Sequence, residues 1–253
     1  MKKLSLFSIL FFSFSLGLLL MPGCKKEKDP GFVQLNFDHL VGGKELKLND
    51  TWYNCAAGHK FQVSRLKYYT SNFVLHAKDG STFEVRKVHY RDIENPDTRT
   101  FSMGEVPRKE YTSLSFIFGL DEVTNVNGGL PNTTTNINME WPLPGDQGYH
   151  YMKFEGRWDS YGTGVYKNFN LHTGATGNNQ NYVNISVPFD HGMKLEDGTW
   201  EINLVMDLNE WLQNPIVYDF ETFGPMIMAN QDAQLVLKQN GADVFSVESV
   251  EKQ

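Results

Sequence analysis

The chain has 253 residues, of which 23 are basic and 30 are acidic, so its formal net charge at neutral pH is −7. This acidic balance, without any basic stripe, argues against a nucleic-acid-binding protein. Its two cysteines, Cys24 and Cys55, exclude a disulfide-rich scaffold, whereas 18 Phe, 11 Tyr and 5 Trp provide for a large apolar core.

The N-terminus has the three parts of a secretory signal peptide. Lys2 and Lys3 form its positive start, and Leu4 to Leu20 is an apolar run interrupted only by serines and one glycine. Gly23 is the small residue before the predicted cleavage. Because the run is short and closely followed by Pro22, it predicts a cleaved signal rather than a membrane-spanning helix.

The residues Met21-Pro22-Gly23-Cys24 resemble a bacterial lipobox. We therefore predict a lipoprotein signal peptide over residues 1–23, a lipid-anchored tether over 24–30 with the lipid on Cys24, and one domain over 31–253. The N-terminal lipid would hold the protein at a membrane of the cell envelope, as an outer-membrane lipoprotein that is periplasmic or surface-exposed. An ordinary cleaved signal with a coincidental cysteine is the alternative.

Alternation of apolar and polar residues predicts strands through most of the mature chain. In chain order the predicted strands are 32–37, 61–69, 72–76, 84–90, 111–118, 149–158, 165–171, 182–187 and 200–205. The pairs Asp79-Gly80 and Asp197-Gly198 predict tight turns between strands. Their aromatic and β-branched residues favour strands over helices.

Three segments depart from this alternation. Residues 121–147 are rich in Asn, Thr, Gly and Pro and form a long loop, which in a compact domain is usually functional or mobile. Asp207 to Leu212 and Ala229 to Gln239 predict short helices, the first capped by Asp207. The pattern predicts an all-β fold, namely an antiparallel β-sandwich with one or two short C-terminal helices.

The sequence carries no catalytic signature. It has no nucleophile elbow, phosphate-binding loop, dinucleotide fingerprint or His-Glu-x-x-His helix, so we predict that the protein is not an enzyme. Cys55 and His59 have a spacing compatible with a thiol–imidazole pair, but spacing alone does not define one.

The seven histidines offer metal ligands instead, because copper and zinc favour imidazole donors. His39 and His172 each close a predicted strand just before a glycine turn. Strand ends meet at the rim of a sandwich, so residues far apart in sequence can converge there. The alternative is that each is simply a polar residue at a loop edge.

A series of motifs then follows the chain in a fixed order. The motifs are Phe37-x-His39, Leu66 to Asn72, Ser115 to Asp121, Gly148 to Gly156 and Phe169 to Gly174. This series resembles the MbnP-like family of extracytoplasmic copper-binding proteins, which includes the methanobactin-associated periplasmic protein and copper-repressible surface proteins. The resemblance spans roughly residues 31–230.

The resemblance implies a β-sandwich that holds copper at one edge. In characterised members two histidines bind Cu(I), and these carry over to His39 and His172. The second ring nitrogen of a metal-bound histidine usually meets a carboxylate or a carbonyl. Asp38, Glu155 and Asp207 are the carboxylates available for that role.

The chain departs from the family at a third residue, a tryptophan that is oxidised to kynurenine near the first histidine. Phe37 stands two positions before His39, and the next tryptophan along the chain is Trp52. The modified residue therefore has no secure counterpart. The resemblance also implies a di-haem peroxidase-like partner, which performs that oxidation in the methanobactin system.

Two functions follow from the sequence. The first is a cell-envelope lipoprotein that binds copper, as Cu(I), at a histidine site for capture or delivery. The second is a surface module on the same scaffold that binds a glycan or protein instead of a metal. The predicted anchor, the acidic composition and the loop over residues 121–147 favour the second.

Overall fold

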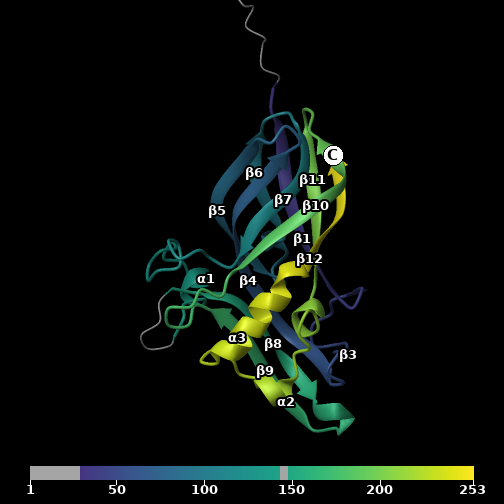
Figure 1. The fold of residues 1–253 in the computed structure, drawn as a ribbon, viewed down its shortest axis with the longest axis vertical. Coiled ribbons are helices and arrows are strands. Elements are labelled where there is room, and N and C mark those ends of the chain that lie inside the picture. The colour runs from purple at the N-terminus through teal and green to yellow at the C-terminus, as the bar shows by residue number, and fades with distance from the viewer. Residues whose placement is uncertain (1–28, 143–147) are drawn as a thin grey trace, which may run out of the picture.

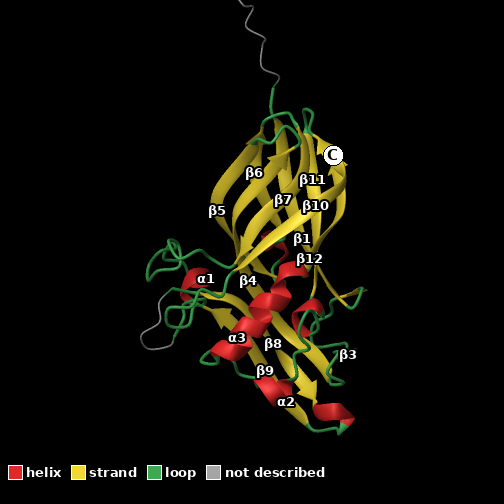
Figure 2. Ribbon diagram, viewed as in Figure 1, coloured by secondary structure: helices red, strands yellow, loops and turns green. Residues whose placement is uncertain are grey.

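The computed structural model describes residues 29–142 and 148–253. The predicted signal peptide and the lipidation site at Cys24 lie outside these residues. The described chain folds into two β-sheets with a few short helices (Figure 1), and strands dominate the ribbon (Figure 2). No helix within the described ranges is long and apolar enough to cross a membrane.

The first sheet, sheet A, is built around the strand that opens the domain. In spatial order it contains β12 (Phe245–Lys252), β11 (Thr199–Asp207), β1 (Gly31–Val41) and β2 (Lys44–Glu45), and β6 (Thr100–Val106) also pairs with β1. The core face of β1 carries Val33, Leu35 and Phe37, all fully buried. β1 runs parallel to β11, so sheet A contains one parallel pair that the antiparallel prediction did not anticipate.

The second sheet, sheet B, is built around β4. In spatial order it contains β10 (Val183–Lys194), β7 (Glu110–Phe118), β4 (Lys60–Ala77), β8 (His150–Asp159) and β9 (Tyr166–Gly174), while β3 (Tyr53–Asn54) and β5 (Thr82–Asp92) also pair with β4. Phe37 of sheet A meets Phe116 of sheet B edge to face, with ring centroids 6.3 Å apart. The two sheets therefore form the predicted sandwich.

β4 spans both halves of the molecule in Figure 1. Its first half pairs with β8, and its second half pairs with β5 and β7. The sequence predicts two strands here, but the chain forms one strand with a bulge at Asn72, whose φ of 54° is left-handed. The Asn72 side chain donates a hydrogen bond to Asp121, and the bulge lets β4 bend without ending.

The helices are short and irregularly placed. They are α1 (Thr134–Ile137), α2 (Phe220–Phe223), α3 (Gln231–Asn240) and the 3-10 turns η1 (Pro96–Thr98), η2 (Ser160–Gly162), η3 (Glu210–Leu212) and η4 (Gly241–Asp243). Helix α3 confirms the helix predicted from Ala229 to Gln239, whereas α2 lies in a segment for which the sequence predicts no helix. The helix predicted from Asp207 is reduced to η3, and the Asp207 carboxylate accepts hydrogen bonds from the backbone of Asn209, Gly42 and Gly43.

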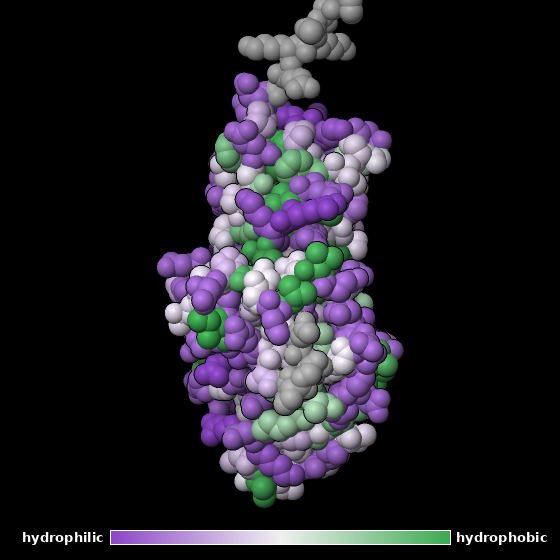
Figure 3. Space-filling view, turned by 90° about the vertical axis from the view of Figure 1, so that its left-hand side faces the viewer, coloured by the Kyte–Doolittle hydropathy of each residue, from purple (hydrophilic) through white to green (hydrophobic). Residues whose placement is uncertain are grey.

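A second, smaller core lies on the outer face of sheet B. Its buried members are Tyr69, Leu120, Leu130, Met139, Tyr149, Tyr151 and Ala175. The described part of the long loop between β7 and β8 supplies four of them, Leu120, Leu130, Met139 and Tyr149, and packs on the sheet. The loop thus adds a layer on the outer face of sheet B, next to the candidate site. The surface on the side of α1 is largely hydrophilic, with separate hydrophobic patches (Figure 3).

Candidate metal centre

The strand register decides which face of sheet B carries His172. Lys67 on β4 is paired with Lys153 on β8, and Lys153 is paired with His172 on β9. Directly opposed residues in antiparallel strands point to the same side of a sheet. All three side chains therefore lie on the outer face, away from the sandwich core.

His39 lies on the other side. Its ring is buried, and Nε2 is 2.9 Å from the hydroxyl of Tyr68, whose side chain belongs to the core between the sheets. Tyr68 follows Lys67 in β4, so the two point to opposite faces. Sheet B therefore separates His39 from His172, and the predicted sharing of one ion between these two histidines does not fit the fold.

His172 has a different histidine neighbour. The His150 ring, at the start of β8, stands edge-on to the His172 ring, with centroids 5.0 Å apart and an interplanar angle of 87°. The pairing of His150 with Gly174 brings the beginning of β8 to the end of β9. Because metal–nitrogen bonds are roughly 2 Å long, rings this close can share an ion.

Hydrogen bonds define the tautomer of each ring. His150 donates from Nδ1 to the Met139 carbonyl at 3.0 Å, and His172 donates from Nε2 to Glu155 Oε1 at 2.9 Å. A carbonyl and a carboxylate can only accept, so these nitrogens carry the protons. The lone pairs are left on His150 Nε2 and His172 Nδ1, and the latter is buried without a hydrogen-bond partner among the described residues.

Glu155 is held by both of its oxygens. Oε1 accepts from His172, and Oε2 accepts from Arg65 Nη1 at 2.7 Å. Burial raises the pKa of this carboxyl, but the hydrogen bond from His172 and the charges of Arg65 and Lys153 outweigh it, so the pKa lies below its usual value. Glu155 is therefore ionised and holds His172 in one tautomer.

His150 is kept neutral by its surroundings. Burial, helped by the charge of Lys153, lowers the pKa of His150 to about 3. A neutral imidazole is the form that binds a metal, so protons compete for His150 only in strong acid.

Trp141 completes the surroundings of the pair. Its ring centroid is 4.8 Å from that of His150, in an edge-to-face arrangement. It also lies against Gly174, where an added β-carbon would be 2.5 Å from the indole. Gly174 thus has no room for a side chain, which explains the glycine directly after the His172-Thr173 pair.

His150 and Trp141 are not among the site residues predicted from the sequence. His150 lies in a segment of alternating apolar and polar residues and so has the pattern of an ordinary strand residue, and Trp141 lies in the loop before β8. Only the pairing of β8 with β9 brings them to His172. A sequence signal did exist, because the Gly148–Gly156 and Phe169–Gly174 motifs of the resemblance each supply one histidine of the pair.

The two other carboxylates proposed from sequence serve elsewhere. Asp38 forms a two-pronged pair with Arg99, at 2.8 and 2.6 Å, and this hydrogen bonding holds the pKa of Asp38 below its usual value despite partial burial. Asp207 binds the backbone of the β1–β2 turn, as described above. Of the three, Glu155 is the one that contacts His172.

Cys55 and His59 do not form a reactive pair. His59 is fully buried, with Nε2 2.9 Å from Asp219 Oδ1 and Nδ1 accepting from the Tyr161 backbone at 3.2 Å. Both ring nitrogens are thus occupied. Burial raises the pKa of the Cys55 thiol, which is the reverse of what a nucleophilic cysteine needs.

The donor set is small. Across residues 29–142 and 148–253, no group of three or more His, Cys, Asp or Glu side chains is placed to hold a metal ion. A metal ion held by His150 and His172 would therefore have few ligands from the described residues. Zn²⁺ in proteins usually takes four ligands, whereas soft metals accept imidazole in smaller sets.

The fold and this site define a β-sandwich protein with two imidazole rings paired on the outer face of one sheet. The family model MbnP matches residues 30–229, and the chain belongs to the MbnP family. Among solved structures it is similar to MbnP from Methylosinus trichosporium, with a TM-score of 0.49 and 15% identity over 87% of this chain and 98% of the other. No curated protein matches the chain.

Proposed function

We propose that the protein binds copper, as Cu(I), between His150 and His172, and that it captures or delivers the metal in the cell envelope. The observation that carries this proposal is the buried Nδ1 of His172, which lacks a partner in the described structure while Nε2 is fixed by Glu155. Leaving a buried polar atom unsatisfied costs about 1–3 kcal/mol. A metal bond to Nδ1 would remove that cost.

The pairing of two imidazole rings favours Cu(I) over harder or more demanding ions. Both imidazoles present a lone pair, and the nearest carboxylate is already engaged in hydrogen bonds. Membership of the MbnP family supports the same metal. We assign the protein a binding role with no catalytic step.

Trp141 takes the place of the tryptophan that the family resemblance requires beside a metal-binding histidine. It stands next to His150 rather than His39, which moves the proposed site from the N-terminal strand to the start of β8. The di-haem peroxidase-like partner would act on Trp141 if it acts on this chain.

A lipid on Cys24 would tether the domain through residues 24–30, which span at most about 25 Å when extended.

The test is a Cu(I) titration of the mature chain under anaerobic conditions, against a competing chelator. His150→Gln and His172→Gln should each weaken binding by about 100-fold or more, because each removes one of two ligands. His191→Gln, at an exposed histidine outside the site, is the matched control and should bind like the parent protein.

A fourth variant separates this site from the one the sequence suggested. His39→Gln should keep its copper affinity, because His39 faces Tyr68 inside the sandwich. Loss of binding in His39→Gln, together with normal binding in His150→Gln, would overturn the proposal.

A further inference from the structure

A polar cavity of about 500 Å³ lies on the outer face of sheet B next to the histidine pair. Its floor carries the cationic side chains of Arg65 and Lys67 from β4 and Lys153 from β8. Thr134 and Thr135 line another wall, as does Thr98, whose hydroxyl is already hydrogen-bonded to Arg91 and to the backbone of Asp92 and Asn95. This volume lies within the range of small-molecule sites, and its lining is rich in hydrogen-bond donors.

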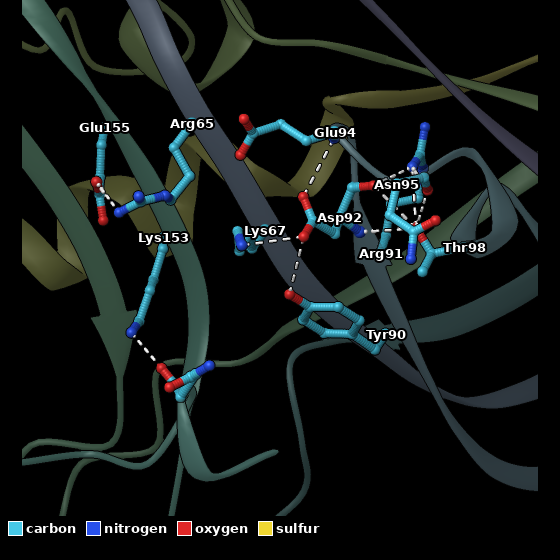
Figure 4. Close-up of polar contacts among 11 residues, drawn as sticks. Arg65, Lys67, Tyr90, Arg91, Asp92, Glu94, Asn95, Thr98, Lys153 and Glu155 are labelled. Carbon is cyan, nitrogen blue, oxygen red and sulfur yellow. Dashed lines mark hydrogen bonds and ion pairs between the residues drawn. The ribbon is translucent and has the colours of Figure 1, made fainter. Parts of the chain in front are cut away.

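Two of the three cations have a carboxylate partner. Arg65 pairs with Glu155 at 2.7 Å, and Lys67 pairs with Asp92 at 3.0 Å. Figure 4 shows both pairs beside the cavity, with the Tyr90 hydroxyl directed at Asp92. These two ion pairs cancel in charge.

Lys153 is the cation left over. Its ammonium group donates to the Asn138 carbonyl, and within the described ranges no carboxylate lies within 4.0 Å of it. Burial lowers the pKa of Lys153, which reflects the loss of water around its charge. The charge of Glu155 acts on Lys153 from farther away, together with those of Arg65 and Lys67. An ammonium group without a directly paired carboxylate gains from an anion in the adjoining space.

The cationic lining of the cavity contrasts with the charge of the protein as a whole. The chain as a whole is acidic, so anions are repelled from most of its surface. The cavity is an exception, because three cations and one carboxylate, Asp92, line it. The hydroxyls of Thr134 and Thr135 can both donate and accept, which suits a ligand that carries hydroxyl groups as well as a charge.

We propose that this cavity binds a small hydroxylated anion, with its carboxylate or phosphate group on Lys153 and its hydroxyls on the threonine-lined wall. The site is distinct from the histidine pair, although Met139 links them: it lines the cavity, and its carbonyl accepts from His150. The proposal does not depend on copper.

The test is calorimetric titration of the metal-free mature chain with glucuronate, glucose 6-phosphate, glucose and inorganic phosphate. Lys153→Met keeps the aliphatic stem of the side chain and removes its charge. Lys78→Met is the control, since Lys78 is an exposed residue directly after β4, beside Glu110 and outside the cavity. Thermal unfolding of both variants checks that they fold like the parent protein.

The proposal predicts that glucuronate or glucose 6-phosphate binds, with glucuronate marking a carboxylate ligand and the sugar phosphate a phosphate ligand. Lys153→Met should weaken binding at least tenfold, since a hydrogen bond to a charged group is worth about 1.5–3 kcal/mol, and Lys78→Met should leave it unchanged. Equal binding of glucose, binding of inorganic phosphate alone, equal affinity in Lys153→Met, or no binding of any probe would each overturn the proposal.

Discussion

Glu155 accepts a hydrogen bond from His172 at 2.9 Å and thereby fixes the proton on Nε2 of that ring. The consequence is that Nδ1, the nitrogen with the lone pair, is the one left buried beside His150. A single carboxylate on β8 thus sets the chemical state of a histidine on β9. This relationship and the packing around it lead to two predictions, and two more concern buried histidines elsewhere and the bulge in β4.

Removing the charge of Glu155 should weaken copper binding. Glu155→Leu leaves His172 free to change tautomer, and loss of such an orienting partner typically costs 10–100-fold in metal affinity. Arg65→Met is the control, because it removes the neighbour of Glu155 but keeps the hydrogen bond to His172. A Cu(I) titration that finds Glu155→Leu equal to the parent protein would show that His172 is not oriented by this contact.

Filling the space at Gly174 should displace Trp141. In Gly174→Ala the new methyl group would meet the indole at 2.5 Å, and overpacking of this kind costs about 1–3 kcal/mol. Tryptophan fluorescence should change as the ring moves, and copper binding should weaken with it.

A double variant tests whether that steric contact is the cause. Gly174→Ala combined with Trp141→Ala should lose less stability than the two single variants added together, because the clash is gone. Strict additivity in urea unfolding would mean that Gly174 is needed for another reason.

Acid should destabilise the fold through buried histidines that are remote from the copper site. Burial lowers the pKa of His39 to about 3 and that of His89 to about 4, with the charge of Arg91 adding to both effects. The unfolded chain, with histidine pKa values near 6.5, then binds more protons between pH 6.5 and these lowered values. Stability therefore falls as the pH drops through this range, by about 2 kcal/mol for each histidine at pH 5.

Comparison of urea unfolding at pH 7 and pH 5 measures that loss. His89→Phe should lose less stability than the parent protein on acidification, because His89 already stacks on Phe37 and a phenyl ring has nothing to protonate. His191→Phe, at an exposed position, should behave like the parent. An unchanged pH response in His89→Phe would contradict the assignment.

The bulge in β4 should depend on Asn72. Its left-handed backbone costs about 1–2 kcal/mol for an ordinary residue but little for glycine. We expect Asn72→Ala to lose more stability than Asn72→Gly in thermal unfolding, although both lose the hydrogen bond to Asp121. The opposite order would show that the side-chain contact, not the backbone, sets the preference.

Bulges also explain which strands the sequence could not predict. β6 and β12 alternate imperfectly, because the register shifts where β6 pairs with β1 and where β12 pairs with β11. Each shift moves the next apolar residue out of the two-residue period. Regular stretches such as the second half of β7, where Leu114, Phe116 and Phe118 are buried at a spacing of two, follow the predicted pattern closely.

The sequence by itself determined the fold class, because alternating apolar residues can be buried together only in sheets that pack on each other. It also pointed to His172 and Glu155, through motifs that are local in the chain. Only the tertiary structure decided the partner of His172. A change of one residue in register sends a side chain to the opposite face of a sheet, so no spacing along the chain reveals that His39 faces the core while His150 meets His172 outside it.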